Sequence, residues 1–239
     1  MIIWRKIGTI NQFRVALHQL IEAKGDELIL SSGYVSHGSQ FSVYDQSNIL
    51  PSMKVAIANG LKNVTIRAGK FRRFSQSTPT SLNALHHNIN GNSSYQERYE
   101  EFLYNLIPFL KSNLTSININ AYIHNNWHAK VAVRADQGRP FAAIIGSSNL
   151  TSTAYGVYPN NYNWECDVLI WRADYPVIRE FSFSYDENRE GKDDKIIHFA
   201  SKSDYFYFEY LPERDEESRL IGIYNEVKNA EGGIRTPTD

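Results

Sequence analysis

Apolar residues at helical spacing alternate with short apolar runs along the first part of the chain. The first predicted helix carries its apolar residues on one face: Phe13, Leu17, Leu20 and Ile21. It should end near Gly25, before a buried strand over 27–36 that runs into small polar residues. A second helix over 49–61 and a short strand over 63–69 follow. This order predicts strands joined by helical crossovers.

The later part of the chain is dominated by strands. A third helix is expected at about 94–112, and Pro108 should kink it or end it early. Four strands then follow closely: SININAYI, WHAKVAV, PFAAIIG and ECDVLIW. Helix–strand alternation followed by a run of strands predicts an α/β domain with a mixed sheet covered by helices. We expect one domain over 1–230, followed by a flexible tail over 231–239.

Composition narrows the functional classes only slightly. The 239 residues include 25 Lys and Arg against 26 Asp and Glu, so there is no general basic excess for nucleic acid. Cys166 is the only cysteine, which excludes an internal disulfide and fits a reducing compartment. The N-terminal residues lack the apolar run of a signal peptide, and no other segment is long and apolar enough to cross a membrane. We therefore expect a soluble, cytoplasmic protein.

Two neighbouring predicted strands carry polar residues that could bind an anion or take part in catalysis. In WHAKVAV, His128 and Lys130 share one face while the other face is apolar. A lysine in this position needs a partner, which predicts a bound anion. The next strand ends at Gly146, after which Ser147 and Asn149 share a face. A cation, a hydroxyl and an amide together predict a phosphate cradle.

Each half of this pattern has a simpler interpretation when taken alone. A histidine at a strand end is commonly a satisfied surface or core residue, and the GSSN segment alone could be a β-turn. The two halves occur in order, however, one strand apart, and Glu165 opens the next apolar strand with a carboxylate that could hold the histidine. The combination favours a functional site.

The chain here resembles the phospholipase D superfamily, whose signature is H-x-K followed by G-S-x-N. The matching residues are 128–130 and 146–149, and Glu165 stands where nucleases of the family often have a glutamate. The resemblance is specific over 128–171 and only architectural over 9–127. One departure is Ala135, where the family usually has an aspartate; Asp136 lies one residue further on.

The resemblance implies a phospholipase D-like α-β-α sandwich and a chemistry without metal or cofactor. Members cleave phosphodiesters through a covalent phosphohistidine. His128 would attack phosphorus, and Lys130, Ser147 and Asn149 would hold the non-bridging oxygens. Glu165 would orient the imidazole.

The mechanism needs a second histidine as general acid, and this chain has only one H-x-K motif. Single-motif nucleases of the family form homodimers in which the two catalytic histidines meet, here the paired His128 residues. The layout most resembles metal-independent restriction endonucleases, whose catalytic domain precedes a separate DNA-recognition domain. The resemblance therefore implies a restriction-type endonuclease that acts on DNA. The chain would be either a catalytic domain whose recognition domain or subunit is separate, or a nuclease of low specificity.

A local basic cluster offers a contact for nucleic acid. RAGKFRRF, residues 67–74, contains Arg67, Lys70, Arg72 and Arg73. These side chains could contact backbone phosphates at the end of a strand. A solvated charged loop is an equally simple interpretation.

Three other functions remain open. The first is a phospholipase or small phosphodiester hydrolase on the same scaffold, which predicts an apolar entrance. The second is a metal-dependent nuclease built on Asp174 and Glu190, which have the loose spacing of a D…E-x-K motif; the E-x-K element also occurs by chance at 22–24. The third is a binding module with a decayed site, against which the intact motif residues argue. The choice between DNA, RNA and another diester, and any recognition sequence, are not encoded in these motifs.

Overall fold

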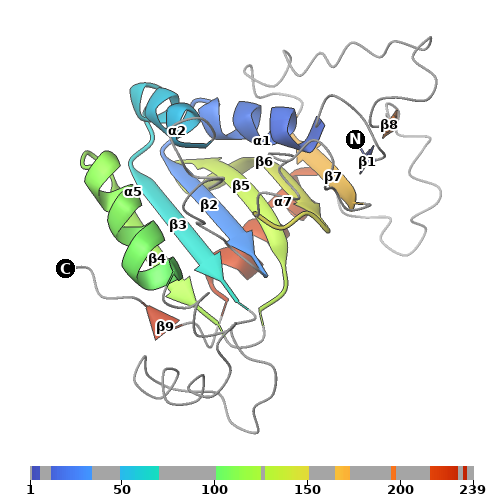
Figure 1. The fold of residues 1–239 in the computed structure, drawn as a ribbon. Coiled ribbons are helices and arrows are strands. Elements are labelled where there is room, and N and C mark those ends of the chain that lie inside the picture. The colour runs from blue at the N-terminus through green and yellow to red at the C-terminus, as the bar shows by residue number, and fades with distance from the viewer. Residues whose placement is uncertain are drawn as a thin grey trace, which may run out of the picture.

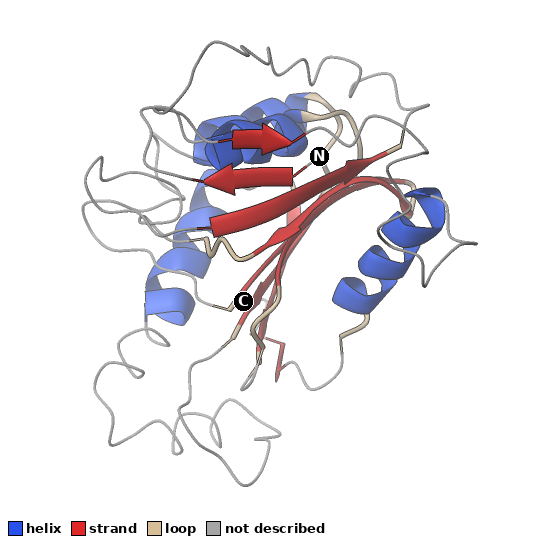
Figure 2. Cartoon of the chain, turned by 90° about the vertical axis from the view of Figure 1, so that its right-hand side faces the viewer, coloured by secondary structure: helices blue, strands red, loops and turns tan. Residues whose placement is uncertain are grey.

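A twisted mixed sheet with helices on both faces forms the molecule (Figures 1 and 2). The computed structural model describes residues 2–5, 12–33, 49–69, 101–124, 127–150, 165–172, 195–197, 216–230 and 234–235. One face of the sheet is covered by the helices from the first half of the chain, and the other face by one C-terminal helix. The predicted α/β class and α-β-α layering are confirmed.

The sheet has nine strands within the described residues. In spatial order they are β8 (Lys195–Ile197), β1 (Ile2–Arg5), β7 (Glu165–Trp171), β6 (Arg139–Gly146), β5 (Lys130–Asp136), β2 (Glu27–Ser32), β3 (Asn63–Ala68), β4 (Asn118–Ile123) and β9 (Ile234–Arg235). β2, β3 and β4 are mutually parallel, because helical crossovers join them. The other neighbours are antiparallel, including the β5–β6 hairpin.

Two apolar layers hold the helices to the sheet. α1 (Gln12–Glu22), α2 (Ile49–Ala58), the π-helical turn η1 (Glu101–Leu106) and α5 (Ile107–Asn113) cover one face. α7 (Glu216–Lys228) covers the other through Leu220, Tyr224 and Val227. Because side chains alternate along a strand, both faces of β5 and β6 are apolar in their central parts.

The strand pattern predicted the sheet well, and one helix prediction needs correction. Four predicted strands correspond to β4, β5, β6 and β7. Pro108 does not end its helix: α5 continues to Asn113, with the proline in its first turn. A proline is tolerated there because the first N–H groups of a helix have no intrahelical acceptor. The change at this point is from π-helical η1 to α-helical α5.

The C-terminal part contains regular structure that the sequence analysis did not predict. α7 was missed, and β9 falls inside the segment predicted as a flexible tail. β9 pairs with β4 at Tyr122 and Ile123, whose strand edge would otherwise present unpaired backbone groups. Within the described residues, no helix combines the length and apolar character needed to cross a bilayer.

Candidate active site

The topology brings the two halves of the motif to one end of the sheet. β5 begins at Lys130 and its antiparallel neighbour β6 ends at Gly146, and these two residues are direct register partners. The end of β2, at Ser32, lies at the same edge, because β2 runs antiparallel to β5 on its other side. Residues separated by one hairpin are thereby placed side by side.

A cavity of about 440 Å³ opens at this end of the sheet. Among the described residues it is lined by His128, Ala129, Lys130, Val131, Ile145, Gly146, Ser147 and Asn149. His128 and Ser147 are exposed, Asn149 is half-buried and Lys130 is 9% exposed. Four of the five residues predicted to be catalytic therefore line one cavity, and their roles stay predictions.

Strand alternation explains how Lys130 comes to stand at the cavity. Ala132 packs into the core beneath α1 and α2, so Lys130 lies on that same face of β5. Val131 and Val133 face α7 instead. The Lys130 ammonium donates a hydrogen bond to the backbone oxygen of His128 at 2.9 Å. This contact links the two polar residues of the H-x-K motif.

The end of β2 fixes the segment that carries His128. Trp127 Nε1 donates to Ser31 Oγ at 2.6 Å, and Ser31 Oγ donates to the Ala129 oxygen at 3.2 Å. A Cβ placed on Gly33 would lie 2.6 Å from His128 Cδ2. Glycine at this position therefore allows the imidazole to pack directly against the backbone after β2.

Ser32, also at the end of β2, holds the second half of the motif. Its hydroxyl lies 3.3 Å from Asn149 Oδ1, to which it donates, and accepts from the Leu150 N–H at 3.0 Å. With Oδ1 accepting from Ser32, Nδ2 is the donor end of the Asn149 amide. A phosphoryl oxygen requires a donor of this kind.

β7 supports the loop after β6 from the opposite side. The backbone N–H of Ser147 donates to the Cys166 oxygen at 3.1 Å, and the Cys166 N–H donates to Ser147 Oγ at 2.9 Å. Ser148 donates through its N–H and hydroxyl to the carboxylate of Asp167. Burial, and secondarily the charge of Asp167, raises the pKa of the Cys166 thiol.

Sequence reasoning missed three residues that support this site: Ser31, Ser32 and Asp167. The serines carried a signal, because ELILSS places two small polar residues at the end of an apolar strand. Asp167 carried a weaker one, as a single charge inside ECDVLIW. Glu165 is the first residue of β7, where its backbone pairs with Arg5, and its role in orienting His128 stays a prediction.

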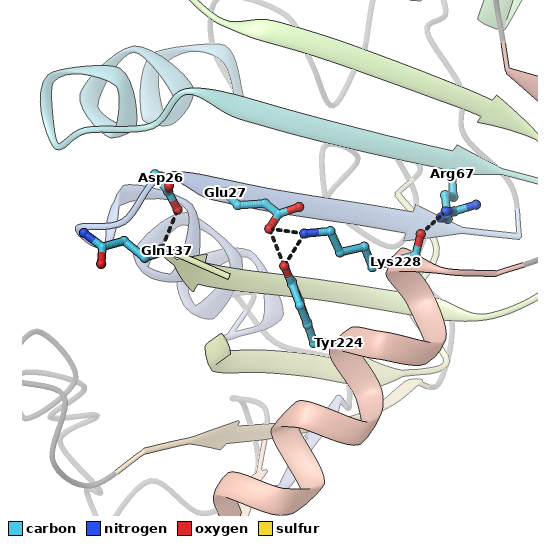
Figure 3. Close-up of polar contacts among 6 residues, drawn as sticks. All are labelled: Asp26, Glu27, Arg67, Gln137, Tyr224 and Lys228. Carbon is cyan, nitrogen blue, oxygen red and sulfur yellow. Dashed lines mark hydrogen bonds and ion pairs between the residues drawn. The ribbon is translucent and has the colours of Figure 1, made fainter. Parts of the chain in front are cut away.

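The structure places Arg67, predicted to bind nucleic acid, on the α7 face of β3. It is 3% exposed, and its guanidinium donates to the backbone oxygen of Lys228 (Figure 3). It also donates to the Ala230 oxygen and to His124 Nε2. Its charge also lies over the Tyr122 ring. Burial lowers the pKa of Arg67 from its ordinary value. These contacts tie the end of α7 to the sheet and do not favour a phosphate contact by Arg67.

The other predicted nucleic-acid contacts, Lys70, Arg72 and Arg73, lie outside the described residues, as do Asp174 and Glu190 of the rival metal site. Within the part of the chain that the structure describes, no three His, Cys, Asp or Glu side chains group as metal ligands would.

No family model and no curated protein matches the chain. The solved structures that are similar to it at low identity include the following three. The first is a phospholipase D family member, Nuc, from Salmonella typhimurium: 16% identity, TM-score 0.36, covering 72% of this chain and 82% of that one. The second is a phosphatidylserine synthase from Haemophilus influenzae Rd KW20: 13% identity, TM-score 0.44, covering 95% and 45%.

The third is TrmBL2, an archaeal chromatin protein: 12% identity, TM-score 0.33, covering 72% and 46%. The chain spans less than half the length of the second and third structures. None of these similarities is high enough to assign this chain to a family. Its own residues therefore carry the functional proposal.

Proposed function

We propose that this protein is a phosphodiesterase of the phospholipase D type that cuts DNA without a metal ion, as a restriction-type endonuclease. One observation carries the proposal: Lys130 and Gly146 are register partners, so the H-x-K and G-S-x-N segments line one cavity. This arrangement joins an exposed imidazole to an ammonium, a hydroxyl and an amide donor. Such a set suits attack on a phosphodiester and stabilisation of the charge that develops.

In the proposed reaction a ring nitrogen of His128 attacks phosphorus. An N–P bond forms as the P–O bond to the leaving group breaks, and the leaving oxygen takes a proton from a general acid. Lys130, Ser147 and Asn149 donate to the non-bridging oxygens, and Glu165 orients the imidazole. Water then attacks phosphorus, loses a proton to the former acid, and breaks the N–P bond. Splitting the displacement in this way replaces one difficult step by two easier ones.

The general acid is proposed to be His128 of a second copy of the chain. Of the described histidines, which are His18, His124 and His128, only His128 lines the cavity. His124 is 4% exposed, and its Nε2 accepts from Arg67, which has no acceptor atoms of its own. His18 contacts Ser52 between α1 and α2. A two-fold axis that pairs the His128 residues would supply both roles.

DNA is the proposed substrate on the strength of the motif and of Lys70, Arg72 and Arg73. A phospholipid or small soluble diester is the second candidate, and a different observation favours it. Ala129, Val131 and Ile145 line part of the cavity, so an apolar group could enter beside the phosphate. Sequence recognition would come from a separate domain or subunit.

The test is cleavage of plasmid DNA in excess EDTA by wild type, His128→Ala and a control, His18→Gln. We expect wild type and control to cut and His128→Ala to be inactive. Quenching with detergent at alkaline pH after reaction with internally ³²P-labelled DNA should leave a protein-bound label, labile to later acid treatment, on wild type and His18→Gln but not on His128→Ala. Loss of wild-type cutting in EDTA would overturn the metal-independent mechanism. Cleavage of phospholipid vesicles or bis(4-nitrophenyl) phosphate, with no cutting of DNA, would select the second candidate.

The homodimer has its own test, which is to mix wild type with increasing amounts of His128→Ala after subunit exchange. If both histidines serve one reaction, activity should fall as the square of the wild-type fraction. A linear fall would place the acid within the same chain.

A further inference from the structure

Asp167 on β7 is a carboxylate buried directly behind the candidate site. It is 1% exposed, and both of its oxygens are engaged by one residue: the Ser148 N–H donates to Oδ1 at 3.2 Å, and Ser148 Oγ donates to Oδ2 at 2.6 Å. A carboxylate is costly to remove from water unless such donors compensate it. The two donors therefore fix Ser148 and Asp167 relative to each other.

The position of Ser148 gives this contact a consequence for the cavity. Ser148 is 3% exposed, whereas its neighbours Ser147 and Asn149 both line the cavity. Holding the N–H and the hydroxyl of the middle residue fixes the backbone between the two donors. Ser32 holds Asn149 from β2, so the loop is supported from both sides of β6.

Gly146 leaves the space that the Asp167 carboxylate occupies. Lys130, Gly146 and Asp167 are register partners across β5, β6 and β7, so they share one face of the sheet. A Cβ on Gly146 would lie 2.0 Å from Asp167 Oδ1. The same Cβ would lie 2.6 Å from the backbone oxygen of Cys166, so glycine in the G-S-x-N segment lets β7 and its carboxylate approach this closely. The carboxylate lies in the same row as the Lys130 cation.

We propose that Asp167 is a positioning residue, which acts through Ser148 to aim Ser147 and Asn149 at the phosphoryl oxygens. This inference rests on the proposed function of the same cavity. The carboxylate touches no substrate atom. It keeps the loop in its binding geometry before substrate arrives, so that no reorganisation is needed when charge develops.

The first experiment compares Asp167→Asn and Ser148→Ala with Asp136→Asn as a matched control. Asp136 is half-buried at the far end of β5, away from the cavity, and loses the same charge. We expect kcat to fall about 100-fold for Asp167→Asn and about tenfold for Ser148→Ala, with KM changed less than about threefold. Asp136→Asn should retain wild-type kcat. Equal losses in Asp136→Asn and Asp167→Asn would overturn the proposal.

A double-mutant cycle with Asn149→Ala separates positioning from general support of the fold. If Asp167 acts through the loop, adding Asp167→Asn to Asn149→Ala should cost less than about threefold further. A full loss of about 100-fold in both backgrounds would show that Asp167 does not act through this donor.

Hydrogen exchange gives a readout that does not depend on activity. The Ser148 amide should exchange faster in Asp167→Ala than in wild type, while amides in the centre of β6 are unchanged. Unchanged exchange at Ser148 would overturn the positioning role. If wild type shows no chelator-resistant cleavage, but Ser148 still exchanges faster in Asp167→Ala, then the proposed function fails and the positioning contact stands.

Discussion

Two buried cations on β5 share one face of the sheet and serve different purposes. Lys130 is 9% exposed and lines the cavity, where it donates to the His128 oxygen. Arg134, four residues along, is fully buried and donates to the backbone oxygens of Ala23 and Gly25 at 2.9–3.0 Å. These oxygens follow the end of α1. A buried cation is therefore a functional signal only where its charge faces a cavity and not a helix end.

Arg67 repeats the arrangement of Arg134 on the opposite face of the sheet. It donates to the oxygens of Lys228 and Ala230 at the end of α7. The last carbonyl groups of a helix lack intrahelical partners and carry partial negative charge, so both arginines satisfy helix C-termini. The guanidinium suits this task because it presents several donors in a fixed plane. The single ammonium of Lys130 instead lines the cavity in which we propose that a phosphate binds.

In the comparison of Lys130 with Arg134, the largest effect on cleavage should come from Lys130→Met, which removes the cation at the cavity. We expect the rate of DNA cleavage to fall about 1,000-fold, because the variant has no cation to place on the phosphoryl oxygens. The melting temperature should change by less than about 3 °C, since replacing a buried charge by an apolar side chain is often neutral or stabilising. Cleavage assays and thermal denaturation on the same samples measure both.

Lys130→Arg is the control for charge alone. The planar fork does not reproduce a point charge, so we expect activity to recover only partly. A large drop in stability in Lys130→Met with unchanged activity would reverse the roles assigned to Lys130 and Arg134.

Arg134→Met tests the structural side. Two backbone oxygens near the end of α1 would be left without their donors inside the protein, and we expect the free energy of unfolding to fall by about 3 kcal/mol. Activity per folded molecule should stay within about twofold of wild type at low temperature. Urea denaturation measures the first quantity and active-site titration the second. A decrease in activity that exceeds the decrease in folded protein would contradict this division.

That four of the proposed catalytic residues share one cavity could be predicted from sequence because their spacing is local. His128 and Lys130 belong to one strand, and Ser147 and Asn149 to the next, so alternation and one hairpin suffice to bring them together. The layers of the fold were predictable for a similar reason, since the apolar periodicities of α1, α2 and β4–β7 are strong. Both predictions used spacings of a few residues.

Contacts between distant segments were not predictable. Ser32 meets Asn149 and Arg67 meets Lys228 across more than 100 residues of chain, and a single sequence gives no sign of such pairs. Arg67 looked like a surface cation because basic residues follow it, although its position on β3 turns it beneath the end of α7. Asp167 was missed because a charge within a strand does not reveal its partner.

Gly33→Ala and Gly138→Ala compare the cavity end of the sheet with the opposite end. The new Cβ at position 33 would lie 2.6 Å from the His128 ring, so we expect the imidazole to shift and cleavage to fall about tenfold. Gly138 lies in the β5–β6 turn at φ +76°, where nothing contacts a Cβ. Alanine there should cost about 1 kcal/mol of stability through backbone strain and leave activity unchanged. Equal activities in the two variants would contradict the packing of His128 on Gly33.

The smallest effect is expected for Arg67→Met on DNA binding. Each phosphate that a cation neutralises adds about 0.9 to the slope of log affinity against log salt concentration, and Arg67 already donates to the end of α7. We therefore expect an unchanged slope in fluorescence anisotropy titrations, together with a lower melting temperature. The variant to compare with Arg67→Met is a combined replacement of Lys70, Arg72 and Arg73. Its slope should fall by about one unit for each phosphate that these side chains neutralise in the wild type. A slope reduced by about one unit in Arg67→Met would show that this side chain leaves the helix end to bind phosphate.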